Sequence, residues 1–288
     1  MRPAWWRPPR SDRLSRERDG KRMLTTTTQR SIDVSGIPVG YHVAGEGPGP
    51  ELVLIHGGTG HPETSFATLL EHFTQHRSAI VPGYSGSSLT PLPEGEVDVD
   101  MLVDQVAGVV EAAARGPVDL FGISTGAVVA AALAGKRPEL VRRMVVLGGF
   151  VHYRRPWQRL LMRTWLRLAE LDPDAFAEFT LLHVVSDTFI DSMSASERLR
   201  LRSGLMPSEG LIALLELINR LDISDYVRKI ECPTLVLGMR QDQLVPVRYA
   251  REFRDAIPGS DYVELDCGHA AAMEKPDELI MTIEKFLA

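Results

Sequence analysis

Residues 118–130 read VDLFGISTGAVVA, an apolar strand-like run that meets a serine bracketed by glycines and then continues as a helix-like run. A serine on a strand-to-helix turn sits in strained backbone geometry. Flanking glycines remove the Cβ atoms that would clash with the strand, the helix and an approaching substrate. Ser124 is therefore a candidate nucleophile, and the interpretation depends on what surrounds it.

Two further segments supply groups that such a serine needs. Residues 52–60 read LVLIHGGTG, a buried-strand run that ends in a glycine-rich loop able to aim backbone N–H groups inward. Near the C-terminus, Asp242 and His269 each follow a strand-like run. A neutral histidine can accept the serine proton near pH 7. An aspartate can hold the other imidazole N–H.

The order serine, aspartate, histidine along the chain resembles that of the α/β-hydrolase fold family, over about residues 30–288. The resemblance implies a catalytic triad of Ser124, Asp242 and His269. It also implies an oxyanion hole formed by the backbone N–H groups of Gly58 and Thr125, with His56 as a residue that braces the loop.

Other aspartates are alternatives for the triad acid: Asp119, Asp222, Asp225 and Asp266. Asp119 should point away from Ser124 because side chains alternate along a strand. Asp266 ends the strand that presents His269, which is an awkward direction for an orienting hydrogen bond. Asp242 matches the family pattern of glycine, a short spacer, aspartate and Val-Pro.

From Arg30 onward the chain alternates between strand-like and helix-like segments. It begins with a hairpin of strands at 31–34 and 38–43 around Ser35-Gly36. The expected strands then lie at 51–56, 78–81, 118–121, 142–147, 233–238 and 261–265, and the expected helices at 63–76, 98–114, 125–136, 247–257 and 273–287. This pattern predicts an α/β fold, with a mostly parallel sheet, helices on both faces and a ligand site at the carboxyl ends of the strands.

The segment 150–228 interrupts this alternation and shows apolar residues at helical spacing, which predicts an inserted helical cap. The expected organisation is a core of residues 30–149 and 229–288, the cap at 150–228, and a basic N-terminal segment at 1–29. The candidate substrate contacts from the cap are Phe150, His152, Tyr153, Trp157, His183 and Met206.

The N-terminal segment carries many arginines and prolines and almost no aliphatic residues, so we expect it to be disordered. It lacks the apolar stretch of a signal peptide. Met23 precedes the first patterned residues, which leaves open whether translation begins at Met1 or at Met23.

The composition fits a cytoplasmic enzyme that acts on a small molecule. The 288 residues are 44% hydrophobic and 24% charged with a formal net charge of −6, which favours neither nucleic acid nor membrane as a partner. Cys232 and Cys267 are interpreted as ordinary thiols. No metal or cofactor is expected, since the loop at 57–60 lacks the lysine of a phosphate loop. The oligomeric state is not indicated.

The residue at the strand-to-helix turn, the nucleophile elbow of this family, restricts which class of reaction is expected. Dehalogenases and epoxide hydrolases of the family use an aspartate there, whereas this chain has Ser124. We therefore expect hydrolysis of a small, fairly apolar carboxylic ester, thioester or lactone through an acyl-enzyme, with amides also open to this chemistry. The alternatives are carbon–carbon bond hydrolysis, acyl transfer, or a ligand-binding protein with little turnover.

Overall fold

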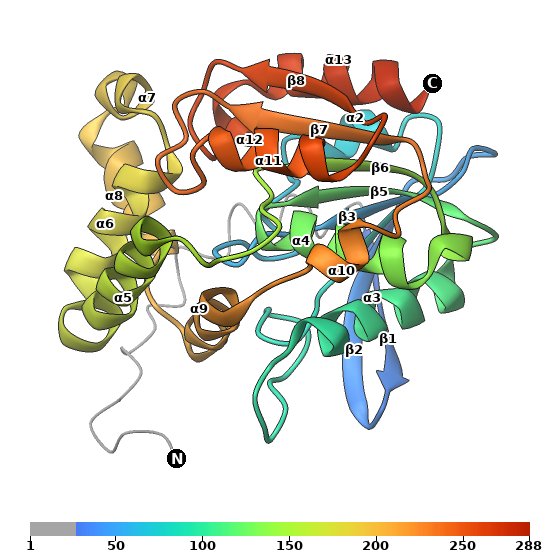
Figure 1. The fold of residues 1–288 in the computed structure, drawn as a ribbon, viewed down its shortest axis with the longest axis horizontal. Helices are drawn as coiled ribbons and strands as arrows, with labels where there is room; N and C mark the ends of the chain where they lie inside the picture. The colour runs from blue at the N-terminus through green and yellow to red at the C-terminus, as the bar shows by residue number, and fades with distance from the viewer. Residues whose placement is uncertain (1–26) are drawn as a thin grey trace.

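The computed structural model describes residues 27–288, and its centre is an eight-stranded sheet (Figure 1). The strands are β1 (Thr27–Val34), β2 (Ile37–Ala44), β3 (Leu52–Ile55), β4 (Ala79–Pro82), β5 (Val118–Ile123), β6 (Val141–Leu147), β7 (Thr234–Met239) and β8 (Asp261–Leu265). Their order across the sheet is β1-β2-β4-β3-β5-β6-β7-β8. β2 pairs antiparallel with β1 and β4, and the other neighbouring pairs are parallel. This arrangement confirms the predicted fold class.

The central strands are buried on both faces, which explains why they read as continuous apolar runs. Alternate side chains belong to different cores. The helices that cover the sheet are α2 (Leu70–Phe73), α3 (Val99–Ala113), α4 (Thr125–Lys136), α11 (Arg248–Ala256), α12 (Ala271–Glu274) and α13 (Pro276–Leu287). Leu120 belongs to the core that includes residues of α3, α4 and α11, whereas Phe121 belongs to the core that includes residues of α2, α12 and α13. The sheet is thus the middle layer of three.

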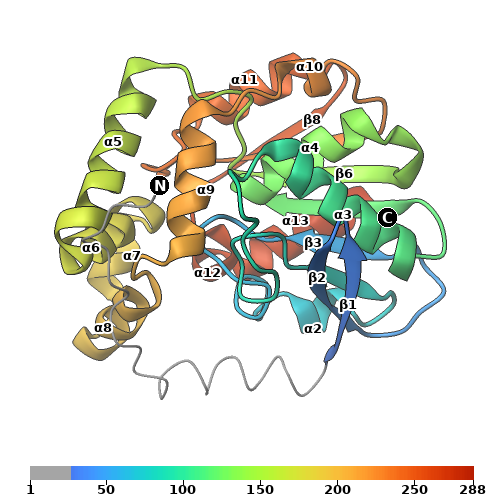
Figure 2. The same ribbon diagram turned by 90° about the horizontal axis from the view of Figure 1, so that it is seen from below.

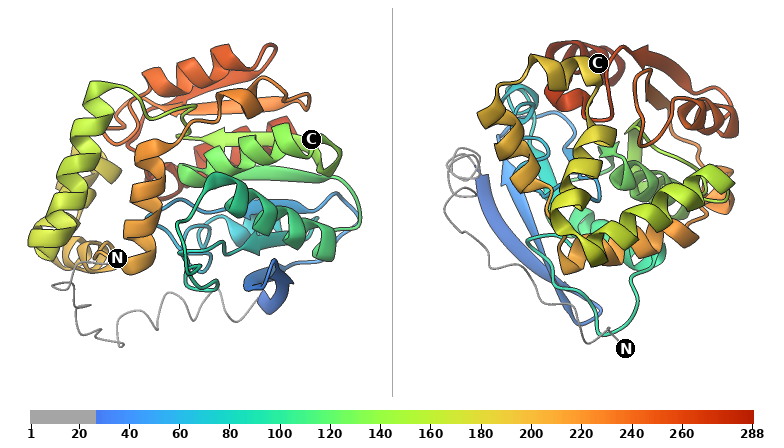
Figure 3. Two further views of the ribbon diagram at one scale, coloured as in Figure 1. Left: turned by 60° about the horizontal axis from the view of Figure 1, so that its bottom comes forward. Right: turned by 90° about the vertical axis from the view of Figure 1, so that its left-hand side faces the viewer.

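The chain between β6 and β7 is helical, and most of it gathers at one end of the sheet (Figures 1 and 2). It contains α5 (Pro156–Leu171), α6 (Pro173–Val184), α7 (Asp187–Ser192), α8 (Ala195–Gly204), α9 (Glu209–Arg220) and α10 (Ser224–Val227). Polar side chains cap several of them: Asp172, Ser186, Ser194 and Ser208 each accept a backbone N–H of the first turn. We call α5–α9 the cap helices; they face the viewer in the right-hand panel of Figure 3.

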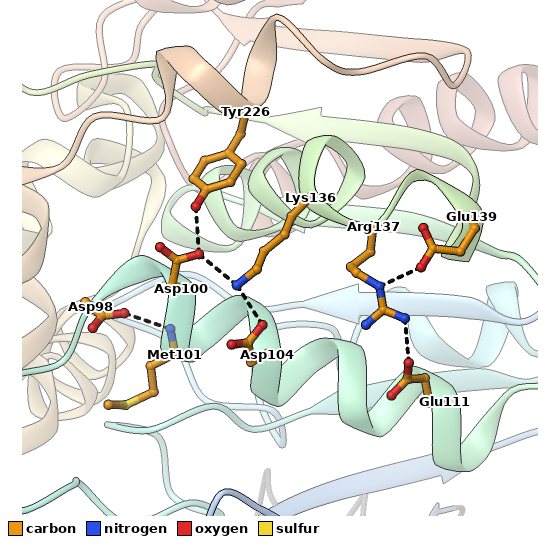
Figure 4. Close-up of polar contacts among 9 residues, drawn as sticks. All are labelled: Asp98, Asp100, Met101, Asp104, Glu111, Lys136, Arg137, Glu139 and Tyr226. Atoms are coloured by element: carbon orange, nitrogen blue, oxygen red, sulfur yellow. Dashed lines mark hydrogen bonds and ion pairs between the residues drawn. The ribbon is translucent and has the colours of Figure 1, made fainter.

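The last inserted helix, α10, is fixed to the core rather than to the cap helices. Tyr226 of α10 donates a hydrogen bond to Asp100 of α3 at 2.7 Å, and Lys136 of α4 contacts Asp100 and Asp104 at 2.8 Å each (Figure 4). A Cβ on Gly135 would lie 2.2 Å from the Tyr226 carbonyl oxygen, so only glycine permits this close packing. The point where the chain returns to the sheet is therefore held by α3 and α4.

The N-terminal boundary differs from the expected one. β1 begins at Thr27, so residues 27–29 belong to the sheet and not to the N-terminal segment. Thr27 pairs with Ala44, and its hydroxyl lies 3.3 Å from His42 Nδ1. Residues 27–31 are all polar, so no apolar alternation marked the start of the strand. The predicted disorder and the alternative start at Met23 lie outside the described residues.

Two expected helices differ clearly in the structure, one by its length and one by a break. The helix at 63–76 reduces to α2, because the preceding residues form turns in which Thr64 and Ser65 both donate backbone N–H groups to the His61 carbonyl. The helix at 273–287 is divided between α12 and α13 at Lys275, which has φ −138° and ψ 52°. Pro276 follows Lys275, and a proline disfavours the helical conformation in the residue before it.

Several further features bear on function. Between residues 27 and 288, no helix is both long and apolar enough to cross a bilayer. Cys232 and Cys267 are free thiols, as predicted. Over the same described range, no three His, Cys, Asp or Glu side chains are grouped so that they could hold a metal ion.

Candidate active site

Ser124 lies at the turn between β5 and α4 with φ 55° and ψ −117°. A positive φ in a residue other than glycine costs about 1–3 kcal/mol and persists only where the surroundings impose it. Here two glycines next to Ser124, Gly122 and Gly126, impose it by letting the backbone pack closely. A Cβ on Gly122 would lie 2.3 Å from the Gly126 carbonyl oxygen, and a Cβ on Gly126 would lie 2.1 Å from that of Ile55. The turn therefore holds Ser124 at the end of the strand in a strained conformation typical of an elbow nucleophile.

The structure brings Asp242 and His269 together in a buried pair. His269 Nδ1 lies 2.6 Å from Asp242 Oδ2, and each residue is 5% exposed. The other carboxylate oxygen, Oδ1, accepts the backbone N–H groups of Leu244 at 2.8 Å and Val245 at 2.7 Å. With Asp242 ionised, Nδ1 must donate, so the neutral ring carries its proton there and leaves Nε2 as an acceptor.

The rival carboxylates have other partners. Asp266 accepts a hydrogen bond from the Gln241 side chain at 3.1 Å. Asp119 is buried on β5, where it forms ion pairs with Arg77 and Arg142. Of the aspartates considered from the sequence, Asp242 is the one bonded to His269.

Gly148 adjoins the imidazole of His269, and its neighbour Leu147 bonds to the serine turn. A Cβ on Gly148 would lie 3.0 Å from His269 Cε1, and the preceding Leu147 carbonyl accepts the Ser124 N–H at 2.8 Å. In the described chain, His269 is hydrogen bonded to Asp242, and no direct hydrogen bond joins its ring to the Ser124 hydroxyl. Hydrogen bonds between catalytic groups are often long before substrate binds.

Gly58 and Thr125 approach each other beside Ser124. A Cβ on Gly58 would lie 3.1 Å from Thr125 Oγ1. Thr125 is the first residue of α4, where backbone N–H groups have no helical partner and favour negative charge. Burial lowers the pKa of His56 to about 4, so its ring is neutral, and its Nδ1 donates to the Gly57 carbonyl at 2.8 Å. His56 thus braces the loop that carries Gly58.

A small apolar cavity of about 30 Å³ opens between the serine turn and the cap helices. Ser124, Gly58 and Thr125 line it together with Phe150 and Tyr153, two of the predicted contacts. The other lining residues are Thr59 from the loop after β3, Met162 and Trp165 from α5, Leu215 and Ile218 from α9, and Leu244 and Val245, which follow Asp242. Burial raises the pKa of the Tyr153 phenol, which keeps it protonated. None of these lining side chains carries a charge.

The remaining predicted contacts lie elsewhere. Trp157 is 38% exposed, and its ring faces Arg248 and Tyr249 of α11. His183 donates from Nδ1 to the Phe179 carbonyl at 2.7 Å. Met206 packs against a separate apolar cluster of the cap, and His152 pairs with Asp222 across an isolated bridge. These four residues do not line the cavity over Ser124.

A family model for the α/β hydrolase fold matches residues 50–276 of the chain. The chain belongs to the α/β-hydrolase fold family. Among curated relatives of this α/β hydrolase, a pyrrolizixenacetamide deacetylase of Xenorhabdus hominickii is 35% identical over 259 residues, covering 89% of this chain and 97% of the relative. A 2-hydroxy-6-oxo-6-(2'-aminophenyl)hexa-2,4-dienoic acid hydrolase of Metapseudomonas resinovorans is 24% identical over 273 residues, covering 90% and 91%.

Solved structures agree on the fold of this α/β hydrolase. The enol-lactonase from Burkholderia xenovorans superimposes with a TM-score of 0.81 at 21% identity, covering 90% of this chain and 99% of that one. A thermophilic esterase from Thermogutta terrifontis gives a TM-score of 0.77 at 22% identity, with 90% and 98% covered.

One residue of this α/β hydrolase that the sequence reasoning missed is Glu274 at the end of α12. Its carboxylate accepts the Gly268 N–H at 3.1 Å, the Ser186 N–H at 3.1 Å and the Ser186 hydroxyl at 2.5 Å. The Ala270 N–H also donates to the Val184 carbonyl at 2.8 Å. The residues on both sides of His269 are therefore tied to the cap. The signal available in the sequence was a glutamate one helical turn after the histidine loop.

Replacing Gly148 by alanine tests the packing of the imidazole. The new Cβ would press on His269 Cε1, and φ +62° adds strain. A catalytic group displaced by about 1 Å can lose about 100-fold in kcat, which is the expected result for an activated ester. Gly259→Ala is the matched control, because Gly259 has φ +80° with nothing within 4 Å of its Cβ position. The prediction is wrong if the two variants lose stability alike in thermal unfolding and keep equal kcat.

Proposed function

We propose that this α/β hydrolase is a serine acyl hydrolase that removes a short acyl group, of the size of acetyl, from an oxygen or nitrogen atom of a small molecule. The observation that carries the proposal is the buried Asp242–His269 pair, linked through Gly148 and Leu147 to the strained Ser124, which lines an apolar cavity of about 30 Å³. The similarity to a deacetylase at 35% identity supports the same reading.

The reaction follows from which atoms can give and take a proton. Ser124 Oγ attacks the carbonyl carbon while its proton passes to His269 Nε2, and the carbonyl π electrons move to oxygen. The backbone N–H groups of Gly58 and Thr125 stabilise this oxyanion. As the oxyanion collapses, the bond to the leaving group breaks and Nε2 returns the proton to it. Water then attacks the acyl-enzyme in the same way, with Nε2 as the base, and the acid is released.

Formation of the acyl-enzyme is tested directly by pre-steady-state kinetics with p-nitrophenyl acetate. We expect a burst of p-nitrophenolate equal to the enzyme concentration, followed by slower turnover. Intact mass spectrometry of the quenched enzyme should find one added acetyl group, and peptide mapping should assign it to Ser124. An acetyl group on another residue would contradict the proposal.

The size of the cavity predicts a preference for short acyl groups. The cavity of about 30 Å³ is small and apolar, so each methylene added to the acyl chain makes it harder to accommodate. We expect kcat/KM to fall by about 10-fold or more from the acetate to the butyrate ester, and further for octanoate. A wild-type enzyme that hydrolyses octanoate as fast as acetate would contradict this expectation.

A cavity-enlarging variant sharpens the same test. Met162 is 1% exposed and lines the cavity from α5, so Met162→Ala should raise the ratio of butyrate to acetate turnover by about 10-fold. Met281→Ala is the control, because Met281 is 66% exposed on α13. Active-site titration with a fluorophosphonate corrects both rates for unfolded protein.

Carbon–carbon bond hydrolysis has less support from the site. The relative from Metapseudomonas resinovorans is named for a dienoic acid, whose carboxylate is ionised at neutral pH. The lining residues of the cavity in this chain include no arginine, lysine or histidine to pair with such a group. A buried, unpaired carboxylate is strongly disfavoured, so an uncharged substrate suits this cavity better.

A further inference from the structure

The hydroxyl of Thr125 is buried beside Ser124 and has no hydrogen-bond partner within the described residues. The residue is 1% exposed and lines the same cavity as Ser124 and Gly58. A buried hydroxyl without a partner is unfavourable, and a bound ligand can supply the missing partner. This observation is independent of the backbone N–H groups used above.

Three other threonines in or next to helices satisfy their hydroxyls within the preceding turn. Thr74, Thr180 and Thr282 each donate to the carbonyl four residues earlier, at 2.8, 2.7 and 2.7 Å. Thr125 is the first residue of α4 and follows the strained Ser124, so no preceding helical turn offers it such a carbonyl. The position of Thr125 in the fold thus keeps its hydroxyl available.

The hydroxyl also lies on the side of the cavity where charge develops in the proposed reaction. Thr125 Oγ1 is 3.1 Å from the position that a Cβ on Gly58 would take, so it adjoins both residues whose N–H groups form the proposed oxyanion hole. A hydroxyl can rotate its hydrogen toward an acceptor without moving its oxygen.

We propose that the Thr125 hydroxyl is a third donor to the oxyanion, in addition to the N–H groups of Gly58 and Thr125 itself. This inference rests on the proposed function. When Ser124 Oγ bonds to the carbonyl carbon and its proton moves to His269, the electron pair gained by the carbonyl oxygen accepts a hydrogen bond from Thr125 Oγ–H. No proton is transferred from the threonine. The hydrogen bond from its hydroxyl weakens when the oxyanion collapses and the carbonyl group reforms.

The test compares Thr125→Ser with Thr125→Ala, two variants that both lack the methyl group and differ by one hydroxyl. We expect kcat of the serine variant to exceed that of the alanine variant by about 100-fold, with similar KM, as for other oxyanion donors. The ratio should be the same for p-nitrophenyl acetate and for p-nitroacetanilide. The affinity for a methyl trifluoromethyl ketone, whose adduct carries the oxyanion, should fall in Thr125→Ala by the same factor.

Two outcomes would overturn the inference. Equal kcat in the Thr125→Ser and Thr125→Ala variants would show that the hydroxyl takes no part in the reaction. A loss confined to the anilide would instead make Thr125 Oγ1 an acceptor for the leaving N–H. Thr125→Val, which keeps the shape of threonine, repeats the comparison if the alanine variant fails to fold. Ser124→Ala is assayed in parallel: if it stays active, the proposed function fails, whereas if it is inactive and the hydroxyl has no effect, only this inference fails.

Discussion

Replacement of Ser124 by alanine should lower kcat for p-nitrophenyl acetate by about 10⁶-fold, as for other enzymes with this mechanism. The reason is that the acyl-enzyme cannot form without Oγ, although the cavity, Asp242 and His269 remain in place. Stopped-flow measurement should show no burst of p-nitrophenolate, and a fluorophosphonate should no longer label the protein. Binding without turnover should persist and be visible as ligand-induced thermal stabilisation.

The matched control for this variant is Ser203→Ala. Ser203 is exposed on α8, and its hydroxyl bonds to the Arg200 carbonyl at 2.7 Å. We expect its kinetics to equal those of the wild type. If Ser124→Ala kept the wild-type rate, hydrolysis would have to use another nucleophile. If the wild type itself turned over no faster than Ser124→Ala, the protein would be a ligand-binding member of the fold.

The sheet could be predicted from the sequence because its signals are local. Strands buried on both faces, such as β3 and β7, appear as short apolar runs. The edge strand β8 also has the predicted bounds, 261–265. The same holds for α4, whose predicted bounds of 125–136 are those of the structure. The start of β1 was not predictable, because residues 27–31 are polar and only their pairing with β2 identifies them as strand.

The loop positions of Ser124, Asp242 and His269 could be predicted from the sequence for a similar reason. Each follows a strand and lies in a loop whose glycines or Val-Pro constrain the backbone locally. The cap residues that line the cavity could not be predicted in this way. The spacing of apolar residues in α5 and α9 indicates which helix face is buried, but not whether the cavity or another helix covers it. Met162 and Ile218 line the cavity, whereas Trp157 of α5 packs on Tyr249 of α11.

Replacement of Asp242 by asparagine should lower kcat by about 10⁴-fold while leaving the fold intact. Asp242 Oδ1 accepts two backbone N–H groups, from Leu244 and Val245, and an asparagine would keep these bonds by placing its own carbonyl oxygen there. Its NH₂ group would then face His269 Nδ1, which must become an acceptor. The ring proton would move to Nε2, the atom that has to receive the proton of Ser124.

Asp266→Asn is the control that separates this tautomer effect from a general loss of charge near His269. Asp266 also lies in the histidine loop, but its carboxylate accepts from Gln241 and not from the imidazole. Its variant should therefore keep kcat within about twofold, as for a surface charge remote from the reacting atoms. If Asp242→Asn kept near-wild-type kcat while Asp266→Asn lost it, the orienting acid would be Asp266. If both variants stayed active, the proton of Ser124 would have to leave by a route that needs no oriented imidazole.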